Sequence, residues 1–300
     1  MRAEQLRLFI LTDARNALSG SRPLSYNRPL GTSDGPGIPE RELTGLDTTE
    51  SGFKIERVGL ETPLLKGATP PLRLVHLSDL HLKSWIPRHR ALVEAVQAWE
   101  PDFVFITGDL RGGRRFDWEA TGRLLSGLTP RHGIFVTRGN WEVRARIRVD
   151  ELRRRLAAFG AELLQNESRV VDTRAGAIRV CGVDDLSLGW PNLQEATAEG
   201  PEAAYTVLLS HAPLAARFVG PAMGVDLLLS GHTHGGQIRI PLLWRLALPS
   251  CHGGYAHGLY REPWGYHYVS RGYDAGGVIT LRFRCPREAT FLEVSPKTRA

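Results

Sequence analysis

The sequence predicts an α/β fold in which a parallel sheet forms the core and a second, mixed sheet packs against it. Two observations carry this prediction. In the first half of the chain, short apolar runs typical of buried strands alternate with segments of helical periodicity, which is the order of a parallel sheet with crossover helices. In the second half, alternating segments follow one another with turns between them, which is typical of a mixed sheet.

The first half has the order β-α-β-α-β. Pro87 suits the first turn of a helix, where its missing N–H costs little, and Gly160 suits the position after a helix end. The predicted strands cover residues 53–58, 72–77, 103–106 and 134–136, and the helices cover 87–99, 118–126 and 150–160. In the second half, strands are predicted over 168–172, 177–183, 207–209, 225–229, 265–270, 278–284 and 290–294.

The length of 300 residues allows one sizeable core with an appendage. Residues 1–52 are expected to be an N-terminal extension, with a short helix over 1–18 followed by a linker rich in Gly, Pro and Ser. Residues 53–300 form the main domain. With 42% hydrophobic and 23% charged residues, the composition is that of an ordinary globular protein.

Charge and cysteine content limit the possible binding partners and the cellular compartment. A formal charge of +6 suits an anionic substrate, and equally an anionic membrane surface or nucleic acid. Three widely spaced cysteines make neither a disulfide framework nor a zinc ribbon, so a cytoplasmic location is expected. Aromatic and basic residues do not interleave as in single-strand binding proteins, so no specific nucleic-acid binding is predicted. No apolar run approaches the roughly 20 residues that span a bilayer.

Five apolar runs end in side chains that commonly bind metals. In an open α/β sheet, such side chains gather beyond the carboxyl ends of the strands. Two histidines separated by one residue in a glycine-bounded turn can each reach a different cation. The seven candidate ligands are Asp79, His81, Asp109, Asn140, His211, His232 and His234.

The order of these motifs, D-x-H, G-D, G-N, H and G-H-x-H, resembles the calcineurin-like metallophosphoesterase superfamily. The run GHTHGGQI at 231–238, with YVSRG at 268–272, resembles its small bacterial branch. The resemblance covers about residues 55 to 295. It implies a four-layer sandwich of two mixed β-sheets flanked by helices, with residues 53–300 as the catalytic domain.

The resemblance also implies a site with two metal ions. Asp79, His81 and His234 would hold the first ion, Asn140, His211 and His232 the second, and Asp109 would bridge them. Mixed nitrogen and oxygen ligands suit Mn, Fe or Zn better than Ca or Mg, and the resemblance implies Mn or Fe, with Zn as an alternative. Asp109, Asn140 and His232 are the expected catalytic residues. A metal-bridging hydroxide would hydrolyse a phosphodiester or a phosphomonoester.

One position departs from the family pattern. The family usually has a histidine after the asparagine, and this chain has Trp141, which cannot act as an acid. We therefore expect Trp141 to select substrates with good leaving groups or a flat apolar portion, such as lipid- or nucleotide-linked phosphoesters. Arg138 and His257 are the other candidate substrate contacts, and a glycine-rich loop around His257 could equally be an exposed loop without a ligand.

Two interpretations of function remain open. The first is a metal-dependent phosphoric ester hydrolase, and the second is a non-catalytic metal-binding scaffold with the same fold. Peripheral membrane association could arise from the N-terminal helix or from the arginine-rich stretch 144–155, which is more often a solvated face. The sequence does not indicate an oligomeric state.

Overall fold

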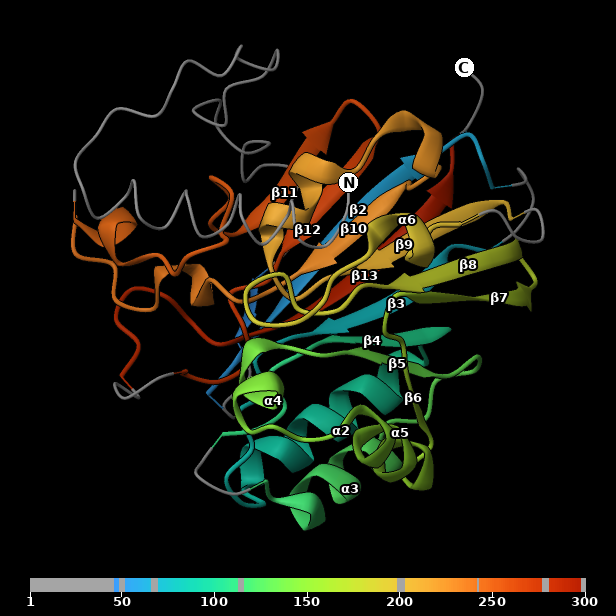
Figure 1. The fold of residues 1–300 in the computed structure, drawn as a ribbon. Helices are drawn as coiled ribbons and strands as arrows, with labels where there is room; N and C mark the ends of the chain where they lie inside the picture. Colours follow the sequence, from blue (N-terminus) through green and yellow to red (C-terminus); the bar gives the residue numbers. More distant parts are fainter. Residues whose placement is uncertain are drawn as a thin grey trace.

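Two β-sheets packed face to face form the centre of the molecule (Figure 1). This computed structural model describes residues 46–48, 52–65, 70–112, 116–198, 203–241, 243–276 and 281–297. The larger sheet contains, in spatial order, β1 (Leu46–Thr48), β2 (Lys54–Thr62), β13 (Glu288–Pro296), β3 (Leu72–Leu77), β4 (Phe103–Thr107), β5 (Ile134–Thr137) and β6 (Ala161–Leu163). The smaller sheet contains β11 (Gly258–Glu262), β12 (Gly265–Val269), β10 (Leu227–Ser230), β9 (Tyr205–Leu209), β8 (Gly176–Gly182) and β7 (Glu167–Thr173).

Both sheets are mixed, as expected. Strands β3, β4, β5 and β6 run parallel, and β13 is antiparallel to β3. In the smaller sheet, β8, β9, β10 and β12 run parallel, while β7 and β11 form antiparallel edges. Strands β4, β9 and β10 are buried along their whole length, which explains why they are almost entirely apolar in the sequence.

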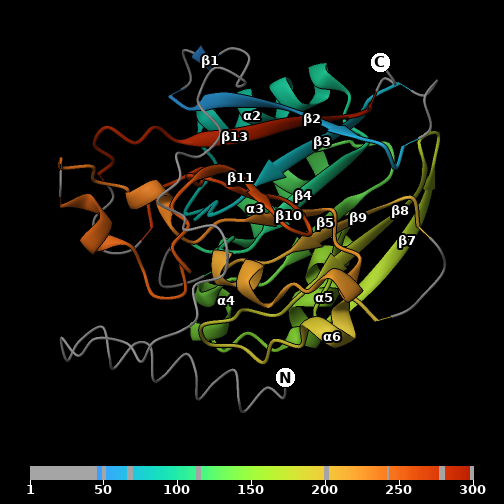
Figure 2. The ribbon, with the colours of Figure 1, turned by 90° about the horizontal axis from the view of Figure 1, so that it is seen from above.

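Helices cover the outer face of each sheet and complete four layers. Helices α2 (Pro87–Trp99), α3 (Trp118–Gly127) and α5 (Val149–Ala158) cover the larger sheet (Figures 1 and 2). Among the described residues, short helices cover the smaller sheet: α6 (Leu193–Ala196) and the 3-10 helices η2 (Pro213–Phe218) and η3 (Pro221–Met223). Between the sheets, Leu74, Phe105 and Phe135 pack with Val207 and Leu229. The predicted fold class is therefore confirmed.

Most predicted elements match within a few residues, and one prediction is wrong in its described part. Residues 281–284 do not form a strand; Phe283 makes only an isolated bridge with Ile238. The alternation of apolar residues and arginines there resembles a strand, but Leu281 and Phe283 are exposed and have no further strand as neighbour. The short strands β6 and β11 were not predicted.

The expected N-terminal extension lies almost entirely outside the described residues. Its described part, Leu46–Thr48, forms β1 and pairs with β2. The helix expected over residues 1–18 and the linker that follows it are outside the described residues, so the boundary at residue 53 stays a prediction. Within the described parts of the chain, no helix is both long and apolar enough to cross a membrane.

Candidate metal centre

All seven candidate ligands lie just beyond the carboxyl ends of five strands, where the edges of the two sheets meet. Asp79 and His81 follow β3, Asp109 follows β4 and Asn140 follows β5. His211 follows β9, and His232 and His234 follow β10. Six of the seven are buried, and His234 is partly exposed. The structure thus brings together the seven side chains that the sequence singled out.

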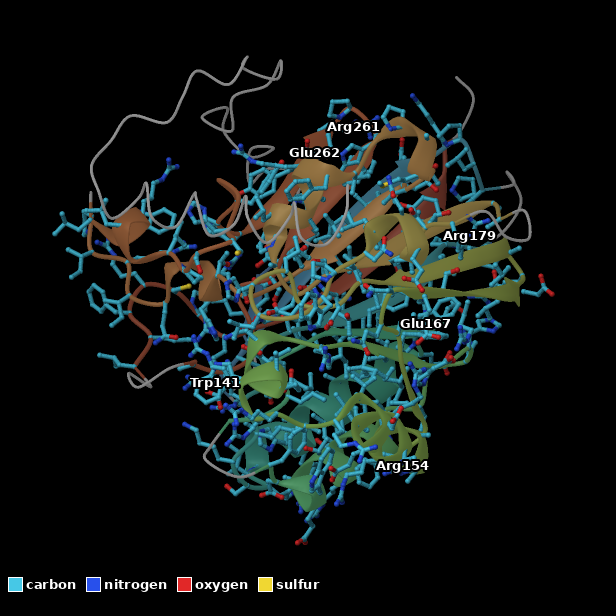
Figure 3. All side chains as sticks on the ribbon, viewed as in Figure 1. Trp141, Arg154, Glu167, Arg179, Arg261 and Glu262 are labelled. Atoms are coloured by element: carbon cyan, nitrogen blue, oxygen red, sulfur yellow. The ribbon has the colours of Figure 1, made fainter. Side chains whose placement is uncertain are left out.

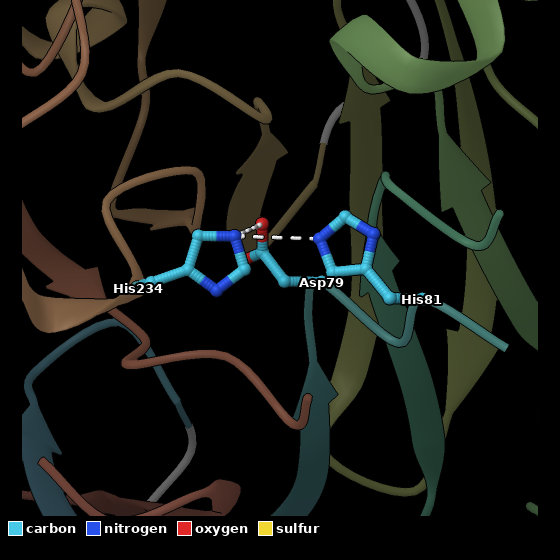
Figure 4. Close-up of side chains that lie close together, drawn as sticks. All are labelled: Asp79, His81 and His234. Atoms are coloured by element: carbon cyan, nitrogen blue, oxygen red, sulfur yellow. Dashed lines mark hydrogen bonds and ion pairs between the residues drawn. The ribbon is translucent and has the colours of Figure 1, made fainter. Parts of the chain in front are cut away.

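Asp79, His81 and His234 form one side of the cluster (Figure 4). His234 Nε2 lies 3.3 Å from Asp79 Oδ1 and 3.3 Å from His81 Nε2. The two imidazole rings are stacked, with centroids 5.1 Å apart. Two nitrogen atoms and a carboxylate oxygen therefore converge on one point.

The other side of the cluster consists of Asp109, Asn140, His211 and His232. His211 Nε2 lies 3.0 Å from Asn140 Oδ1, 3.0 Å from His232 Nδ1 and 3.4 Å from Asp109 Oδ2. Asp109 Oδ2 also lies 3.8 Å from His81 Nε2. Asp109 thus faces both halves of the cluster, and Asp79 also lies close to Asp109 and His211.

Backbone carbonyl groups determine which nitrogen faces the cluster in His81, His211 and His232. A carbonyl oxygen can only accept, so His81 Nδ1 donates to Arg111 O at 2.9 Å and His211 Nδ1 donates to Thr107 O at 2.8 Å. His232 donates through its other nitrogen, Nε2, to Ser250 O at 2.7 Å. His234 Nδ1 lies 3.1 Å from both Asp274 O and Arg282 Nη2. Such partners orient the ligands in metal sites.

This arrangement requires an added positive charge. With one nitrogen donating to a carbonyl, the neutral rings of His211 and His232 would place two lone pairs 3.0 Å apart. Only a proton or a metal cation between them makes that approach favourable. His211 favours an added proton. Burial lowers the pKa of His211, but the charge of Asp109 and its hydrogen bond raise that pKa well above the usual value.

Two further observations show that the residues fit a cation. Asp79 Oδ1 is buried and has no hydrogen-bond partner, whereas Oδ2 accepts from Ser78 Oγ and from the His232 N–H. At Gly276, a Cβ atom would lie 2.4 Å from His234 Nε2 and 2.8 Å from His81 Nε2. The glycine therefore keeps the space in front of these nitrogen atoms open.

The pKa values of Asp79, Asp109 and His234 suit metal ligands. Burial would raise the pKa of both carboxyl groups, but the neighbouring histidines hold the pKa values of Asp79 and Asp109 below their usual range. Burial lowers the pKa of His234 to about 4, against the opposing charge of Asp79. Ionised carboxylates and neutral imidazoles are the forms that bind metals.

The backbone at these residues is strained. Five of the seven have positive φ angles between 43° and 69°, which non-glycine residues rarely adopt, at a cost of about 1–3 kcal/mol each; they are Asp79, His81, Asp109, His232 and His234. Hydrogen bonds between neighbouring loops hold this conformation: Asp79 N donates to Gly108 O at 3.1 Å and His81 N to Asp109 O at 2.9 Å. Strain of this kind concentrates at functional sites.

Glu142, which was not among the predicted site residues, accepts hydrogen bonds from the backbone of the loops that carry the candidate ligands. Its Oε2 accepts from the N–H groups of Asp109 and Gly139, both at 2.9 Å, and its Oε1 accepts from Arg111 N at 3.2 Å. Burial and the charge of Asp109 raise its pKa to about 7, and the N–H groups of Gly139 and Arg111 oppose the rise. A glutamate three residues after Gly139 at the start of α4 (Asn140–Arg144) is a capping-box pattern, so the sequence did contain a signal.

We expect Glu142→Gln to destabilise the chain by about 2–4 kcal/mol, because the amide NH₂ group would face at least one of three backbone donors in a buried place. Urea unfolding in EDTA measures this. Glu119→Gln, at an exposed position on α3, is the matched control and should stay within about 0.5 kcal/mol of wild type. Equal stability of both variants would contradict the assigned role.

The predicted substrate contacts have different surroundings. The Arg138 guanidinium is buried and forms two hydrogen bonds with Asp184, at 2.9 and 2.7 Å, so its charge already has a partner. Trp141 is partly exposed, and its ring meets the ring of His81 edge to face, with centroids 5.3 Å apart (Figure 3 labels Trp141). The backbone N–H of Trp141 donates to Asp109 Oδ1 at 2.9 Å. Trp141 therefore borders the cluster directly.

The loop around His257 touches the cluster through its backbone. Ser250 O holds His232, and Ala256 O accepts from Thr233 Oγ1. The His257 ring lies 6.5 Å from that of Trp244, and burial with two nearby arginines lowers its pKa to about 3. The substrate roles of Arg138, Trp141 and His257 remain predictions.

A buried cluster of carboxylates, imidazoles and one amide, at the carboxyl edges of two packed sheets, defines a metal-binding α/β protein. The sequence profile of the calcineurin-like phosphoesterase family matches residues 72–236, which is more than half of the chain and includes all seven candidate ligands. The chain belongs to this family. The family assignment implies divalent metal ions, and the two groups of Asp and His side chains are the places that could hold them.

Curated relatives agree with this assignment. The chain is 33% identical to an uncharacterized metallophosphoesterase of Helicobacter pylori, over 80% of this chain and 64% of the relative. It is 26% identical to the uncharacterized metallophosphoesterase YkuE of Bacillus subtilis, over 82% of this chain and 84% of the relative. A transmembrane protein with metallophosphoesterase domain of Danio rerio is 31% identical over 65% of this chain and 47% of its own length. The chain spans less than two thirds of the Helicobacter relative's length.

Proposed function

We propose that this chain is a metal-dependent phosphoric ester hydrolase with a dinuclear centre. The observation that carries the proposal is the convergence of four imidazoles on two buried carboxylates and one amide, with the distal nitrogen of each ring facing a backbone carbonyl. A structural polar cluster would satisfy its own lone pairs. In this cluster, the lone pairs of His211 Nε2 and His232 Nδ1 face one another.

We assign the ligands to two overlapping sets, in the division that the resemblance implies. Asp79, His81 and His234 would hold one ion, Asn140, His211 and His232 would hold the other, and Asp109 would serve both. The mixed nitrogen and oxygen set favours Mn or Fe, with Zn as an alternative. Two such cations would activate a water and neutralise charge on the phosphoryl oxygens.

The protein's own residues position this chemistry. Glu142 fixes the backbone of Asp109 and Gly139, and the carbonyl groups fix the imidazole rings, so the ligands are arranged before any substrate arrives. Asn140 and His232 lie on the side of the cluster next to His211, where they would also face a phosphoryl oxygen. Such preorganisation is a large part of catalysis by charged sites.

Turnover of a simple phosphodiester tests the proposal. Metal-stripped chain reconstituted with Mn should hydrolyse bis-p-nitrophenyl phosphate, and EDTA should abolish the activity. Fe and Zn are tested in parallel. If none of the three metals supports turnover but the chain still binds them, the alternative applies, and the fold acts here as a metal-binding scaffold.

The substrate class is the finer part of the proposal. Trp141 presents an aromatic edge and face beside His81, where the family usually has a histidine. An indole cannot protonate a leaving group, but it can pack against a flat or apolar one. We therefore favour a phosphodiester with a good leaving group, linked to a lipid or a nucleotide.

Trp141→His should change substrate preference. We expect the ratio of kcat/KM for alkyl over aryl phosphodiesters to rise by about tenfold or more, because histidine can donate a proton to a poor leaving group. Trp190→His, at a Trp that is 55% exposed, is the control for removing an indole. An unchanged ratio in Trp141→His would rule out this role for Trp141.

A further inference from the structure

An exposed apolar surface lies next to the metal centre. Among the described residues, five of the eight large apolar side chains that are strongly exposed belong to only two segments. They are Ile240, Leu243, Leu246, Leu281 and Phe283, with exposed fractions of 49%, 57%, 84%, 63% and 49%. We call these five residues the apolar tip. A cluster of this kind normally marks an interaction site.

The two segments are held together by backbone hydrogen bonds. Arg239 N donates to Phe283 O at 2.9 Å, and Phe283 N donates to Gln237 O at 3.0 Å. Their loops protrude beyond the strand ends, at the left of Figure 1 and again at the left of Figure 2. The first segment follows η4 (His234–Gly236) directly, so the apolar tip is connected to a candidate metal ligand by a few residues.

The charged side chains of the two segments themselves have one sign, and one of them, Arg287, pairs with Asp274 at 3.2 Å. The sequence has no Asp or Glu between Asp226 and Glu262, and none between Asp274 and Glu288. The charged residues within 235–250 and 281–287 are all arginines: Arg239, Arg245, Arg282, Arg284 and Arg287. Arg245 and Arg284 are exposed, and the guanidinium groups of Arg239 and Arg245 lie 5.2 and 5.6 Å from the centre of the Trp244 ring.

Apolar side chains at a protruding tip, a tryptophan next to them and exposed arginines in segments that contain no acidic residue are the combination that interfacial membrane segments use. We propose that the apolar tip docks the protein on an anionic lipid bilayer, with Leu243 and Leu246 entering the headgroup region and the arginines meeting lipid phosphates. The inference goes beyond the proposed hydrolase activity and would hold even if the chain were not catalytic.

The arginine-rich stretch at 144–155 is a weaker candidate for the same role. There Arg148 pairs with Asp150 at 3.6 Å, Arg155 with Glu151 at 3.1 Å, and Arg153 with Glu167 at 2.7 Å. None of the strongly exposed apolar side chains of the described chain lies in this stretch. The charge is therefore partly balanced, and an apolar anchor is missing there.

Vesicle flotation with the full chain tests the proposal. In 0.1 M salt we expect wild type to float with vesicles of phosphatidylcholine and phosphatidylglycerol, and to stay unbound with phosphatidylcholine alone. Leu246→Asp should weaken partitioning by about tenfold or more, because it replaces an inserting side chain with a charge. Leu64→Asp, at a leucine that is 46% exposed elsewhere, is the matched control and should bind like wild type.

Three results would overturn the proposal: wild type that binds neither kind of vesicle, Leu246→Asp that binds as well as wild type, or a wild-type dimer that Leu246→Asp converts to a monomer. The last result would assign the apolar tip to a second copy of the chain. Hydrolysis of soluble bis-p-nitrophenyl phosphate by Leu246→Asp, measured beside flotation, separates loss of docking from loss of the metal centre.

Discussion

Asp109→Asn should reduce kcat/KM for bis-p-nitrophenyl phosphate by about 10³-fold or more in saturating Mn. Asp109 faces both halves of the cluster, with Oδ2 at 3.4 Å from His211 Nε2 and 3.8 Å from His81 Nε2. Asparagine has the same shape and can keep the hydrogen bond from Trp141 N through its oxygen. The substitution therefore removes the shared charge and leaves the backbone in place.

Asp117→Asn provides the matched control. Asp117 caps α3 by accepting from Ala120 N at 2.9 Å, and asparagine caps equally well. The activity of Asp117→Asn should equal that of wild type. Activity of Asp109→Asn within tenfold of wild type would show that Asp109 does not have the shared role assigned to it.

Gly276→Ala should abolish most of the stabilisation that Mn gives to the folded chain. The new Cβ atom would lie 2.4 Å from His234 Nε2 and 2.8 Å from His81 Nε2, in the space that a cation would need. We expect Mn affinity to fall by about 100-fold. A ligand at 1,000 times its dissociation constant raises unfolding free energy by about 4 kcal/mol, so a 100-fold loss leaves roughly 1.4 kcal/mol.

Thermal or urea unfolding with and without Mn measures this difference. The metal-dependent gain is compared within each variant, so any direct effect of the alanine on the apo protein cancels. Gly220→Ala is the control, because a Cβ there has no neighbour within 4 Å. An equal Mn-dependent gain in Gly276→Ala and Gly220→Ala would place the cation elsewhere.

The sequence predicts much of the fold because the core sheet is built from local signals. The helix predicted over 87–99 matches α2 at both ends, where Pro87 begins the first turn and Glu100 adopts a left-handed conformation. The fully buried β4 appears in the sequence as an uninterrupted apolar run. The segment 281–284 shows the limit of such signals, since alternation without a neighbouring strand does not make a strand.

The location of the ligands within each sheet is predictable because parallel strands end at the same edge. That the edges of the two sheets meet, so that the ligands after β9 and β10 join those after β3, β4 and β5, does not follow from this rule. What the rule does not reveal are contacts between loops that are distant in the sequence. Gly276 reaches His81 and His234, and Asp184 binds Arg138, through tertiary packing alone. No local pattern around these residues indicates their partners.

The apolar tip could not be predicted either, because local sequence patterns do not show which loops are exposed. Ile240, Leu243 and Leu246 are apolar residues that no local pattern marks as exposed, and their exposure is seen only in the tertiary structure. The structure places them beyond the sheet edge, in the segment that follows the candidate metal ligand His234.

The central claim is that two cations share Asp109 at the edge of the two sheets. Anomalous diffraction from crystals soaked in Mn, recorded at the Mn absorption edge, tests it most directly. We predict two anomalous peaks beside the Asp109 carboxylate, one next to His81 and His234 and the other next to His211 and His232. A single peak, or peaks only at other positions, would contradict the dinuclear centre.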